Sequence, residues 1–149
     1  MAKKINITIN FDLDGTLADL YGVPNWLPML RSEDETPYVV AKPLLQLNLL
    51  ARRLNKLQKA GYKLGVISWL SMDASDTYNE KVIAAKRLWL KVHMPSVHWD
   101  NMVLVPYGTP KENYGSANDI LFDDDEKNRT AWKGTAYDVD NILGILAKL

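Results

Sequence analysis

The stretch NITINFDLDGTLADL, residues 6–20, predicts a buried strand that is followed at once by a turn. Apolar and polar residues alternate up to Phe11, which is the period of a strand with one buried face. Two aspartates, Asp12 and Asp14, then precede a glycine and a threonine, and another apolar run comes next. A turn alone would explain Gly15, but it would not explain two carboxylates at a spacing of two.

The rest of the chain alternates strand patterns with helix patterns. Strands are expected near residues 62–67, 102–105, 120–122 and 135–139, and helices near residues 43–60, 73–94 and 142–146. Strands that alternate with helices favour a doubly wound α/β fold, with a parallel sheet of about five strands and helices on both faces. Polar residues in the first strand indicate that one face of the sheet is thinly covered, because central parallel strands are ordinarily apolar on both faces.

Composition restricts the class of protein. The 149 residues suit a single domain, residues 1–149, and its 18 basic and 18 acidic side chains leave no net charge to attract an extended nucleic acid or a membrane. The absence of cysteine excludes disulfides, thiolate catalysis and cysteine-rich zinc sites. No segment has the length and apolarity of a membrane span, and the amino-terminal MAKKINITIN lacks the apolar core of a signal peptide. We therefore expect a cytoplasmic protein.

Residues 20–42 interrupt the alternation with three prolines among aromatic and apolar residues. We interpret this segment as a short lid, inserted after the first strand and lying over the carboxyl edge of the sheet. Tyr21, Trp26 or Tyr38 could stack on a base, and Arg31 could meet a second anionic group of a ligand. Packing of the aromatic residues against the core is the competing interpretation.

In doubly wound sheets, ligands bind beyond the carboxyl ends of the strands. This rule brings together residues from four parts of the chain: Asp12 and Asp14, Ser68, Lys111, and Asp123 and Asp124. Clustered carboxylates need a cation, and an oxygen-only ligand set suits Mg²⁺. A hydroxyl group and a lysine suit a phosphate. The set predicts phosphoryl transfer, with one aspartate as nucleophile and the other as acid and base.

Each of these signals alone has a simpler interpretation. An Asp-x-Asp-Gly sequence also occurs in turns and in calcium loops, although the residues after Gly15 do not continue a calcium loop. Ser68 could be a strand-end hydroxyl, Lys111 a solvated lysine, and the acidic run 123–126 the start of a helix. Lys86 competes with Lys111, but its place in the middle of a helix favours a solvated side chain, so we favour Lys111. The order of all the elements together supports the site.

The chain resembles the haloacid dehalogenase superfamily of phosphatases over nearly its whole length. DLDGTL at residues 12–17 is similar to the first motif of that superfamily, Ser68 after KLGVI to the second, Lys111 in YGTPK to the third, and ILFDDDEKN at residues 120–128 to the fourth. The resemblance implies that Asp12 is a nucleophile that forms an aspartyl-phosphate and that Asp14 is the general acid and base.

The resemblance also implies a ligand set. Mg²⁺ would be held by the Asp12 carboxylate, the Asp14 backbone carbonyl and Asp124, with Asp123 and Asn128 in support. By the same resemblance, Ser68 and Lys111 would bind the phosphate. Apart from it, we expect substrate contacts from Thr16, from Trp69, which follows Ser68 at the sheet edge, and from Trp26 of the insertion. The insertion is much shorter than a full helical cap of this superfamily, so it offers fewer contacts for choosing a substrate.

Within the superfamily, the short insertion and the paired aspartates of the fourth motif resemble small 5′(3′)-deoxyribonucleotidase relatives, which implies a nucleoside monophosphate as the small-molecule substrate. A phosphatase for another small or macromolecular phosphoester and a non-catalytic phosphate-binding module are the alternatives, and the oligomeric state is left open. A receiver domain is disfavoured, because it needs an aspartate after the third strand, where residues 106–109 read PYGT.

Overall fold

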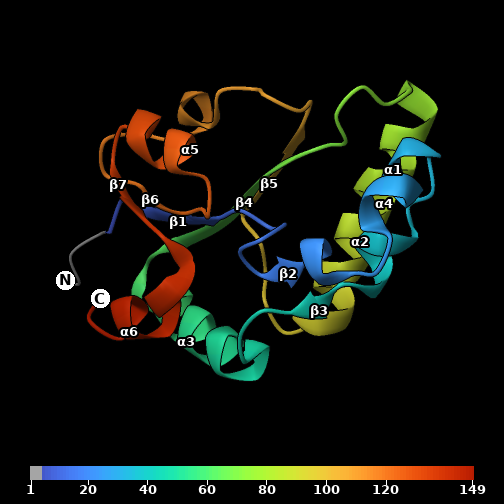
Figure 1. Cartoon of the computed structure of the whole chain (residues 1–149). Helices are drawn as coiled ribbons and strands as arrows, with labels where there is room; N and C mark the ends of the chain where they lie inside the picture. Colours follow the sequence, from blue (N-terminus) through green and yellow to red (C-terminus); the bar gives the residue numbers. More distant parts are fainter. Residues whose placement is uncertain (1–4) are drawn as a thin grey trace.

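The computed structural model describes residues 5–149, and the first four residues, part of the stretch considered for a signal peptide, lie outside the described residues. Five strands form one parallel sheet in the order β5 (Asn101–Val105), β4 (Lys63–Trp69), β1 (Thr8–Phe11), β6 (Ile120–Phe122) and β7 (Thr135–Tyr137). β1 is central, and the chain winds outward from it in both directions (Figure 1). This is the doubly wound α/β sheet that the sequence predicts.

The central strand β1 is shorter than its alternating pattern suggested, because regular pairing begins at Thr8. Ile9 and Phe11 are completely buried in the main core, as expected for the apolar face. Asn10 points the other way and is also buried, and its side-chain amide donates a hydrogen bond to the Ile120 carbonyl at 3.3 Å. A polar residue is tolerated in the middle of the sheet because its amide has a partner there.

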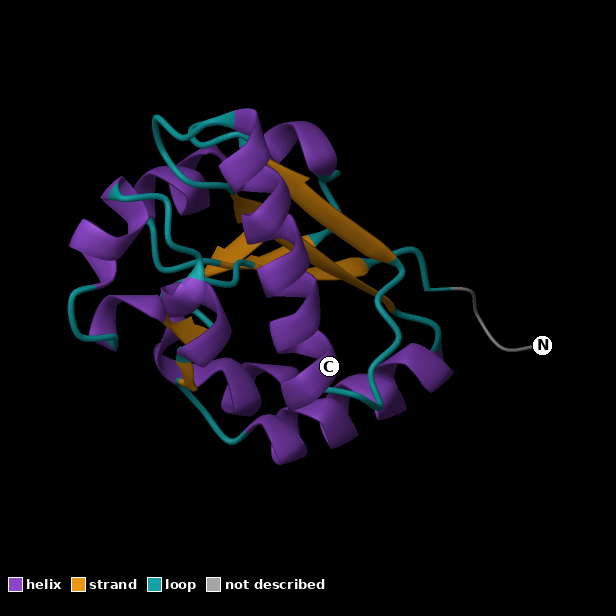
Figure 2. Ribbon diagram, turned by 90° about the vertical axis from the view of Figure 1, so that its right-hand side faces the viewer, coloured by secondary structure: helices purple, strands orange, loops and turns teal. Residues whose placement is uncertain are grey.

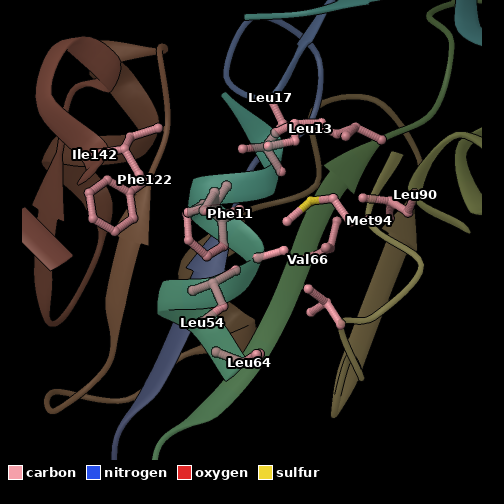
Figure 3. Packing of buried hydrophobic residues seen from close by; sticks show 14 of the residues in the cluster. Phe11, Leu13, Leu17, Leu54, Leu64, Val66, Leu90, Met94, Phe122 and Ile142 are labelled. Atoms are coloured by element: carbon pink, nitrogen blue, oxygen red, sulfur yellow. The ribbon is translucent and has the colours of Figure 1, made fainter. Parts of the chain in front are cut away.

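The two faces of the sheet are covered unequally. The main core lies on the face of α3 (Leu47–Ala60) and α6 (Ile142–Leu146), where Leu54 packs beside Phe11, and Phe122 beside Ile142 (Figure 3). The opposite face carries only a small cluster, Ile67, Leu121 and Trp132, the last of which comes directly after α5 (Glu126–Ala131). The thin cover predicted from the polar residues of the first strand is therefore present.

The helix α3 departs from its predicted start. Pro43 is not in its first turn but in β3 (Lys42–Pro43), and the helix begins at Leu47 after a Gln46 N-cap. Gly61 ends the helix in the left-handed conformation, with φ 117°, which agrees with the sequence. Of the helices within residues 5–149, none has the length and apolarity needed to cross a bilayer.

Residues 20–42 form an insertion that is flanked by two short strands. β2 (Ala18–Asp19) pairs antiparallel with β3 and closes the base of the insertion, which contains η1 (Leu20–Gly22), α1 (Trp26–Arg31) and α2 (Thr36–Val40). In Figure 1 these helices group with α4 (Asp76–His93), away from α3 and α6, and Figure 2 shows helices packed around the sheet.

A second, smaller core joins the insertion to the first half of α4. It consists of six buried residues: Leu20, Tyr38, Leu70, Tyr78, Val82 and Ala85. α4 therefore begins against the insertion, while Trp89 and Leu90 in its second half belong to the main core. The same helix connects the insertion with the body of the domain.

Candidate active site

The two aspartates of the opening stretch lie in a tight turn directly after β1. The Asp12 amide donates to the Phe122 carbonyl at 2.9 Å, so the backbone is still fixed to the neighbouring strand at that point. Gly15 adopts a φ of 80°, and a Cβ at this position would collide with the Asp124 carboxylate. Glycine is therefore required both by the turn and by the approach of the fourth motif.

Three carboxylates from two strand ends form a cluster. One oxygen each of Asp12, Asp123 and Asp124 lies within 4.8 Å of the others. Asp123 is completely buried and Asp12 is 7% exposed, whereas Asp124 is exposed at the cavity. Thr16 donates its hydroxyl towards Asp12 Oδ2 at 3.2 Å and towards Asp124 Oδ1 at 3.4 Å. The turn after β1 thus connects the carboxylates of both strand ends.

Asp123 is held by several donors from the segment immediately after it. Its Oδ1 accepts from the Asp125 amide at 2.9 Å, and its Oδ2 accepts from the Asn128 side-chain amide at 3.1 Å. The Arg129 guanidinium donates to the Asp123 carbonyl at 3.0 Å. Asn128 therefore orients a carboxylate of the cluster, and Asp123 belongs to the cluster itself.

Lys111 lies between the two buried carboxylates. Its ammonium donates to Asp12 Oδ1 at 2.9 Å and to Asp123 Oδ2 at 2.8 Å, and the side chain is only 2% exposed. The residue lies in η2 (Lys111–Tyr114), which brings it back to the sheet after β5. The ammonium also lies 5.3 Å from the centroid of the Trp69 ring. The interpretation of Lys111 as a solvated lysine is wrong.

Lys86 is also buried at this edge, and the prediction that its side chain is solvated is wrong. Only 1% of it is exposed, and its ammonium donates to Asp14 Oδ2 at 2.8 Å, Ser68 Oγ at 2.7 Å and the Trp69 carbonyl at 2.7 Å. A signal was present in the sequence. Lys86 is four residues from both Val82 and Leu90, so it lies on the apolar stripe of α4 rather than on its polar face.

The pKa values of the clustered groups differ with their partners. Burial acts to raise the pKa of Asp12, but the charge and hydrogen bond of Lys111 outweigh it and hold this pKa below its ordinary value. Burial raises the pKa of Asp14 despite Lys86. Burial, together with the neighbouring Asp12, raises the pKa of Asp123 to about 6 and that of Asp124 to about 8. The cluster thus holds more carboxylates than Lys111 neutralises.

This donor set fits a divalent cation. Its ligand atoms are oxygens only, which suits hard cations. Burial, and after it the neighbouring Asp12, raises the pKa values of Asp123 and Asp124, and a bound cation would favour their ionised forms. The Asp14 carboxylate is turned to Lys86 and lies outside the cluster. The expected contribution of Asp14, through its backbone carbonyl, stays a prediction.

The carboxylates open into a cavity of about 450 Å³ that lies between the sheet edge and the insertion. Two aromatic pairs line it: Trp69 with Tyr107, at 4.9 Å between ring centroids, and Tyr21 with Trp26, at 5.0 Å. The remaining walls include Ser68, Lys111 and Asn128, along with Leu30, Arg31, Glu33 and Tyr38 from the insertion. Lys86 is screened from the cavity behind Asp14 and Ser68, the groups to which it donates.

The structure brings the predicted site residues to one place. Asp12, Asp14, Ser68, Trp69, Lys111, Asp123, Asp124, Asn128 and Trp26 all line the cavity, and Thr16 lies behind the carboxylates. Lys86, Tyr107, Glu33 and Ser71 are among the neighbours that the sequence did not place in the site. Tyr107 carries no signal of its own, because it comes after a strand in a short polar loop.

Comparisons with known proteins place the fold. No family model matches the chain, and no curated protein matches it. Among solved structures, the D,D-heptose 1,7-bisphosphate phosphatase from Burkholderia thailandensis is similar, with a TM-score of 0.52 over 98% of this chain and 97% of that one. The two sequences are 11% identical, so this likeness establishes a shared fold.

Proposed function

We propose that this protein is a Mg²⁺-dependent phosphomonoester hydrolase that acts through an aspartyl-phosphate on Asp12. The observation that carries the proposal is the arrangement of charge at the cavity floor. The ionised Asp12 lies beside Lys111 in a cluster of three carboxylates, and Asp14 lines the same cavity two residues away. A similar fold serves a phosphatase in the heptose bisphosphate enzyme.

In the first step, an Asp12 carboxylate oxygen attacks phosphorus, and the bond from phosphorus to the ester oxygen breaks. Asp14 gives its proton to that oxygen, so the alcohol leaves neutral. Lys111 holds Asp12 in place, and it also lowers the pKa of Asp12, which keeps that carboxylate ionised for attack on phosphorus. Burial raises the pKa of Asp14, which is the direction that favours the protonated form of a general acid.

In the second step, the ionised Asp14 takes a proton from a water molecule, which attacks phosphorus and releases phosphate. The Asp12 carboxylate and the protonated Asp14 are restored, so the cycle balances. Ser68 lies on the cavity wall with its hydroxyl already next to Lys86, and it contacts the phosphoryl group in both steps. Lys111 has one N–H that donates to no group among residues 5–149, and this donor is available to the phosphate.

Asp12, Asp124 and the Asp14 backbone carbonyl would hold Mg²⁺, and Asp123 and Asn128 would support them. When bound, the cation supplies positive charge that offsets the carboxylates and the negative charge of the phosphoryl group. The donor set of oxygens and the repulsion within the cluster support this assignment.

A nucleoside monophosphate is the substrate class that we favour. The aromatic pairs on the cavity walls offer flat faces for a base, and base–aromatic stacking accepts any base because each has a π-face. Arg31 lines the cavity, and it forms no ion pair with a carboxylate of residues 5–149, so its charge is available for a second polar or anionic group. The insertion would act as a small lid that surrounds the leaving group.

The test is Mg²⁺-dependent release of phosphate from a panel of nucleoside 5′- and 3′-monophosphates and sugar phosphates. Release that is concentrated on deoxynucleotides supports both the chemistry and the substrate. Release from unrelated phosphates keeps the hydrolase and discards the nucleotide preference. If folded, metal-loaded protein releases phosphate from none of them, the hydrolase proposal for small substrates fails, and a phosphate-binding module becomes the better interpretation.

A further inference from the structure

The ammonium of Lys86 has no donor left for a substrate. A lysine ammonium offers three N–H groups, and the Asp14 carboxylate, the Ser68 hydroxyl and the Trp69 carbonyl accept one each at 2.7–2.8 Å. The side chain is 1% exposed and does not line the cavity. Its contacts are with protein groups, so its effect on any bound ester must act through them.

One of these groups is the carboxylate that the proposed reaction uses as acid and base. Lys86 occupies Oδ2 of Asp14, and Oδ1 accepts from no group among the described residues 5–149. The Asp14 side chain is 15% exposed and lies on the cavity wall. The hydrogen bond therefore fixes the carboxylate through Oδ2 and leaves Oδ1 as its oxygen without a partner among these residues.

Lys86 is itself placed by the insertion. Its ammonium lies 5.1 Å from the centroid of the Tyr38 ring in α2, close enough for a favourable cation–π contact. The ring is 5% exposed, and the Tyr38 hydroxyl is within 2.9 Å of the Ser71 hydroxyl in the loop after β4. Tyr38 thus lies between the insertion and the lysine, with its hydroxyl fixed to the sheet edge.

The insertion is attached to the start of α4 by further hydrogen bonds. Glu33 accepts from the Ser75 amide at 2.9 Å and from its hydroxyl at 2.8 Å. The Tyr78 hydroxyl donates to the Asp34 carbonyl at 2.9 Å. α4, which carries Lys86, is therefore held against the insertion at several points, and the position of its ammonium depends on that contact.

We propose that Lys86 and Tyr38 are positioning residues, through which the insertion holds the Asp14 carboxylate with Oδ1 towards the leaving oxygen. This inference rests on the proposed function. In the step concerned, the proton moves from Asp14 Oδ1 to the ester oxygen as the bond to phosphorus breaks. Esters whose alcohol leaves poorly need that proton, whereas the phenolate of 4-nitrophenyl phosphate leaves without it.

The experiment compares kcat/KM for 4-nitrophenyl phosphate with that for an alkyl phosphate such as glycerol 2-phosphate, both with Mg²⁺. We expect Lys86→Met to lower kcat/KM for the alkyl ester about 30-fold more than for the aryl ester, since positioned acid catalysis contributes on the order of 10²–10⁴-fold. Tyr38→Leu should show the same selective loss at a smaller size, and Tyr38→Phe, which keeps the ring, should restore most of it.

Two control variants separate positioning from general damage. Lys111→Met removes a phosphate contact at a residue that makes no hydrogen bond with Lys86 or Asp14, so it should lower kcat/KM for both esters alike. Ile142→Ala removes a buried apolar residue of the main core, a different cluster from the one that joins Tyr38 to α4, so it should leave the ratio of the two esters unchanged. Thermal unfolding of each variant identifies one that fails to fold, and Tyr38→Phe and Tyr38→Leu then provide the test without removal of a buried charge.

The outcomes distinguish this inference from the function on which it rests. A selective loss on the alkyl ester in Lys86→Met and Tyr38→Leu supports it. If the wild type hydrolyses both esters but kcat/KM falls equally for both in these variants, the positioning role is wrong and the proposed hydrolase function is unaffected. If the folded wild type hydrolyses neither ester, nor any of the nucleoside and sugar phosphates, the proposed function fails and the inference fails with it.

Discussion

Two buried lysines pair with the two aspartates of the opening stretch, Lys111 with Asp12 and Lys86 with Asp14, and within residues 5–149 they differ in the number of N–H donors that remain free. Lys111 gives two hydrogen bonds to the carboxylates of Asp12 and Asp123 and lines the cavity. Lys86 gives three hydrogen bonds and lies behind the cavity wall. Both have an aromatic ring near the ammonium, Trp69 from the sheet edge and Tyr38 from the insertion.

The comparison of Lys111 with Lys86 shows that burial and charge alone do not identify a ligand-binding lysine. A buried ammonium must have partners, since an unpaired buried charge is costly, and both residues meet that requirement. What separates them is the number of donors that remain after those partners are counted. Lys111 keeps one for a phosphate, whereas Lys86 acts on the substrate only through Asp14 and Ser68.

Of the two lysine substitutions, Lys111→Met should have the larger effect on activity. The variant loses an N–H donor to the phosphate, and Asp12 and Asp123 lose the lysine ammonium that lies between them. We expect kcat/KM to fall by about 10²–10³-fold, as for loss of one preorganised donor. Steady-state kinetics with the alkyl and aryl esters measure it. In contrast to Lys86→Met, the loss should be equal for both esters. If Lys111→Met instead lowered kcat/KM mainly for the alkyl ester, the two lysines would have the same role, and the distinction drawn between them would be wrong.

The same pair of variants can be compared in stability. Removing one partner of a buried ion pair costs about 3–5 kcal/mol, and Lys111 joins two carboxylates that are both largely buried. Thermal unfolding without Mg²⁺ should therefore show a clear loss in Lys111→Met. Because Asp14 is partly exposed, the loss in Lys86→Met should be smaller. The reverse order in unfolding temperature would contradict this account of the two sites.

Asp124→Asn tests whether the carboxylate cluster binds Mg²⁺. Loss of one carboxylate should weaken Mg²⁺ binding by at least about tenfold, because a hard divalent cation prefers charged oxygen ligands. Titration calorimetry with Mg²⁺ gives the affinity directly. Asp125→Asn is the matched control, since Asp125 is the N-cap of α5 and lies outside the cluster. Equal affinity in wild type and Asp124→Asn would remove Asp124 from the ligand set.

Stability without metal should fall as the pH rises from about 4 to about 8. Folding raises the pKa of Asp123 to about 6 and that of Asp124 to about 8, so between their unfolded and folded pKa values the folded state binds more protons. Unfolding free energy then decreases with pH across that range. The lowered pKa of Asp12 acts the other way, with stability lost only in more acidic solution.

Mg²⁺ should reverse this trend because it binds the ionised carboxylates. Thermal unfolding at about pH 5.5 and about pH 8.5, with and without Mg²⁺, measures the effect on either side of the raised pKa values. The increase in melting temperature on adding Mg²⁺ should be larger at the higher pH, and it should shrink in Asp124→Asn. An increase of equal size at both pH values would contradict the assignment of these carboxylates to a cation.

The smallest effect should come from Trp26→Ala on the insertion side of the cavity. Stacking of a base on an aromatic side chain is worth about 1–3 kcal/mol, so KM for a nucleoside monophosphate should rise at least about fivefold. KM for glycerol 2-phosphate should stay unchanged, because it has no base. If both KM values rise alike, Trp26 packs the insertion and does not contact the base.

The sheet and its site edge were predictable because they depend on local patterns and one topological rule. The alternation up to Phe11 and the apolar run before Asp123 give strands, and parallel strands bring the residues after their carboxyl ends to one edge. The prediction for Lys86 is wrong because the rotation of α4 about its axis depends on the insertion, with which it shares a core. The helical spacing from Val82 to Lys86 holds that information, although the charge of a lysine by itself favours a solvated side chain.

The start of α3 and the shape of the insertion could not be predicted for a related reason. Pro43 suits a first helical turn, yet its pairing with Ala18 holds it in a short strand that closes the insertion. That pairing joins residues far apart in the sequence and has no local signature. The walls of the cavity, including Tyr107 and Glu33, depend on the same kind of distant contact.

The most direct test of the central claim is release of phosphate by wild type and Asp12→Asn, with and without Mg²⁺. We predict Mg²⁺-dependent release by the wild type and none by Asp12→Asn, whose unfolding temperature should show that it remains folded. The asparagine keeps the size of the side chain but cannot act as the nucleophilic carboxylate. Phosphate release by folded Asp12→Asn at the wild-type rate would contradict an aspartyl-phosphate on Asp12.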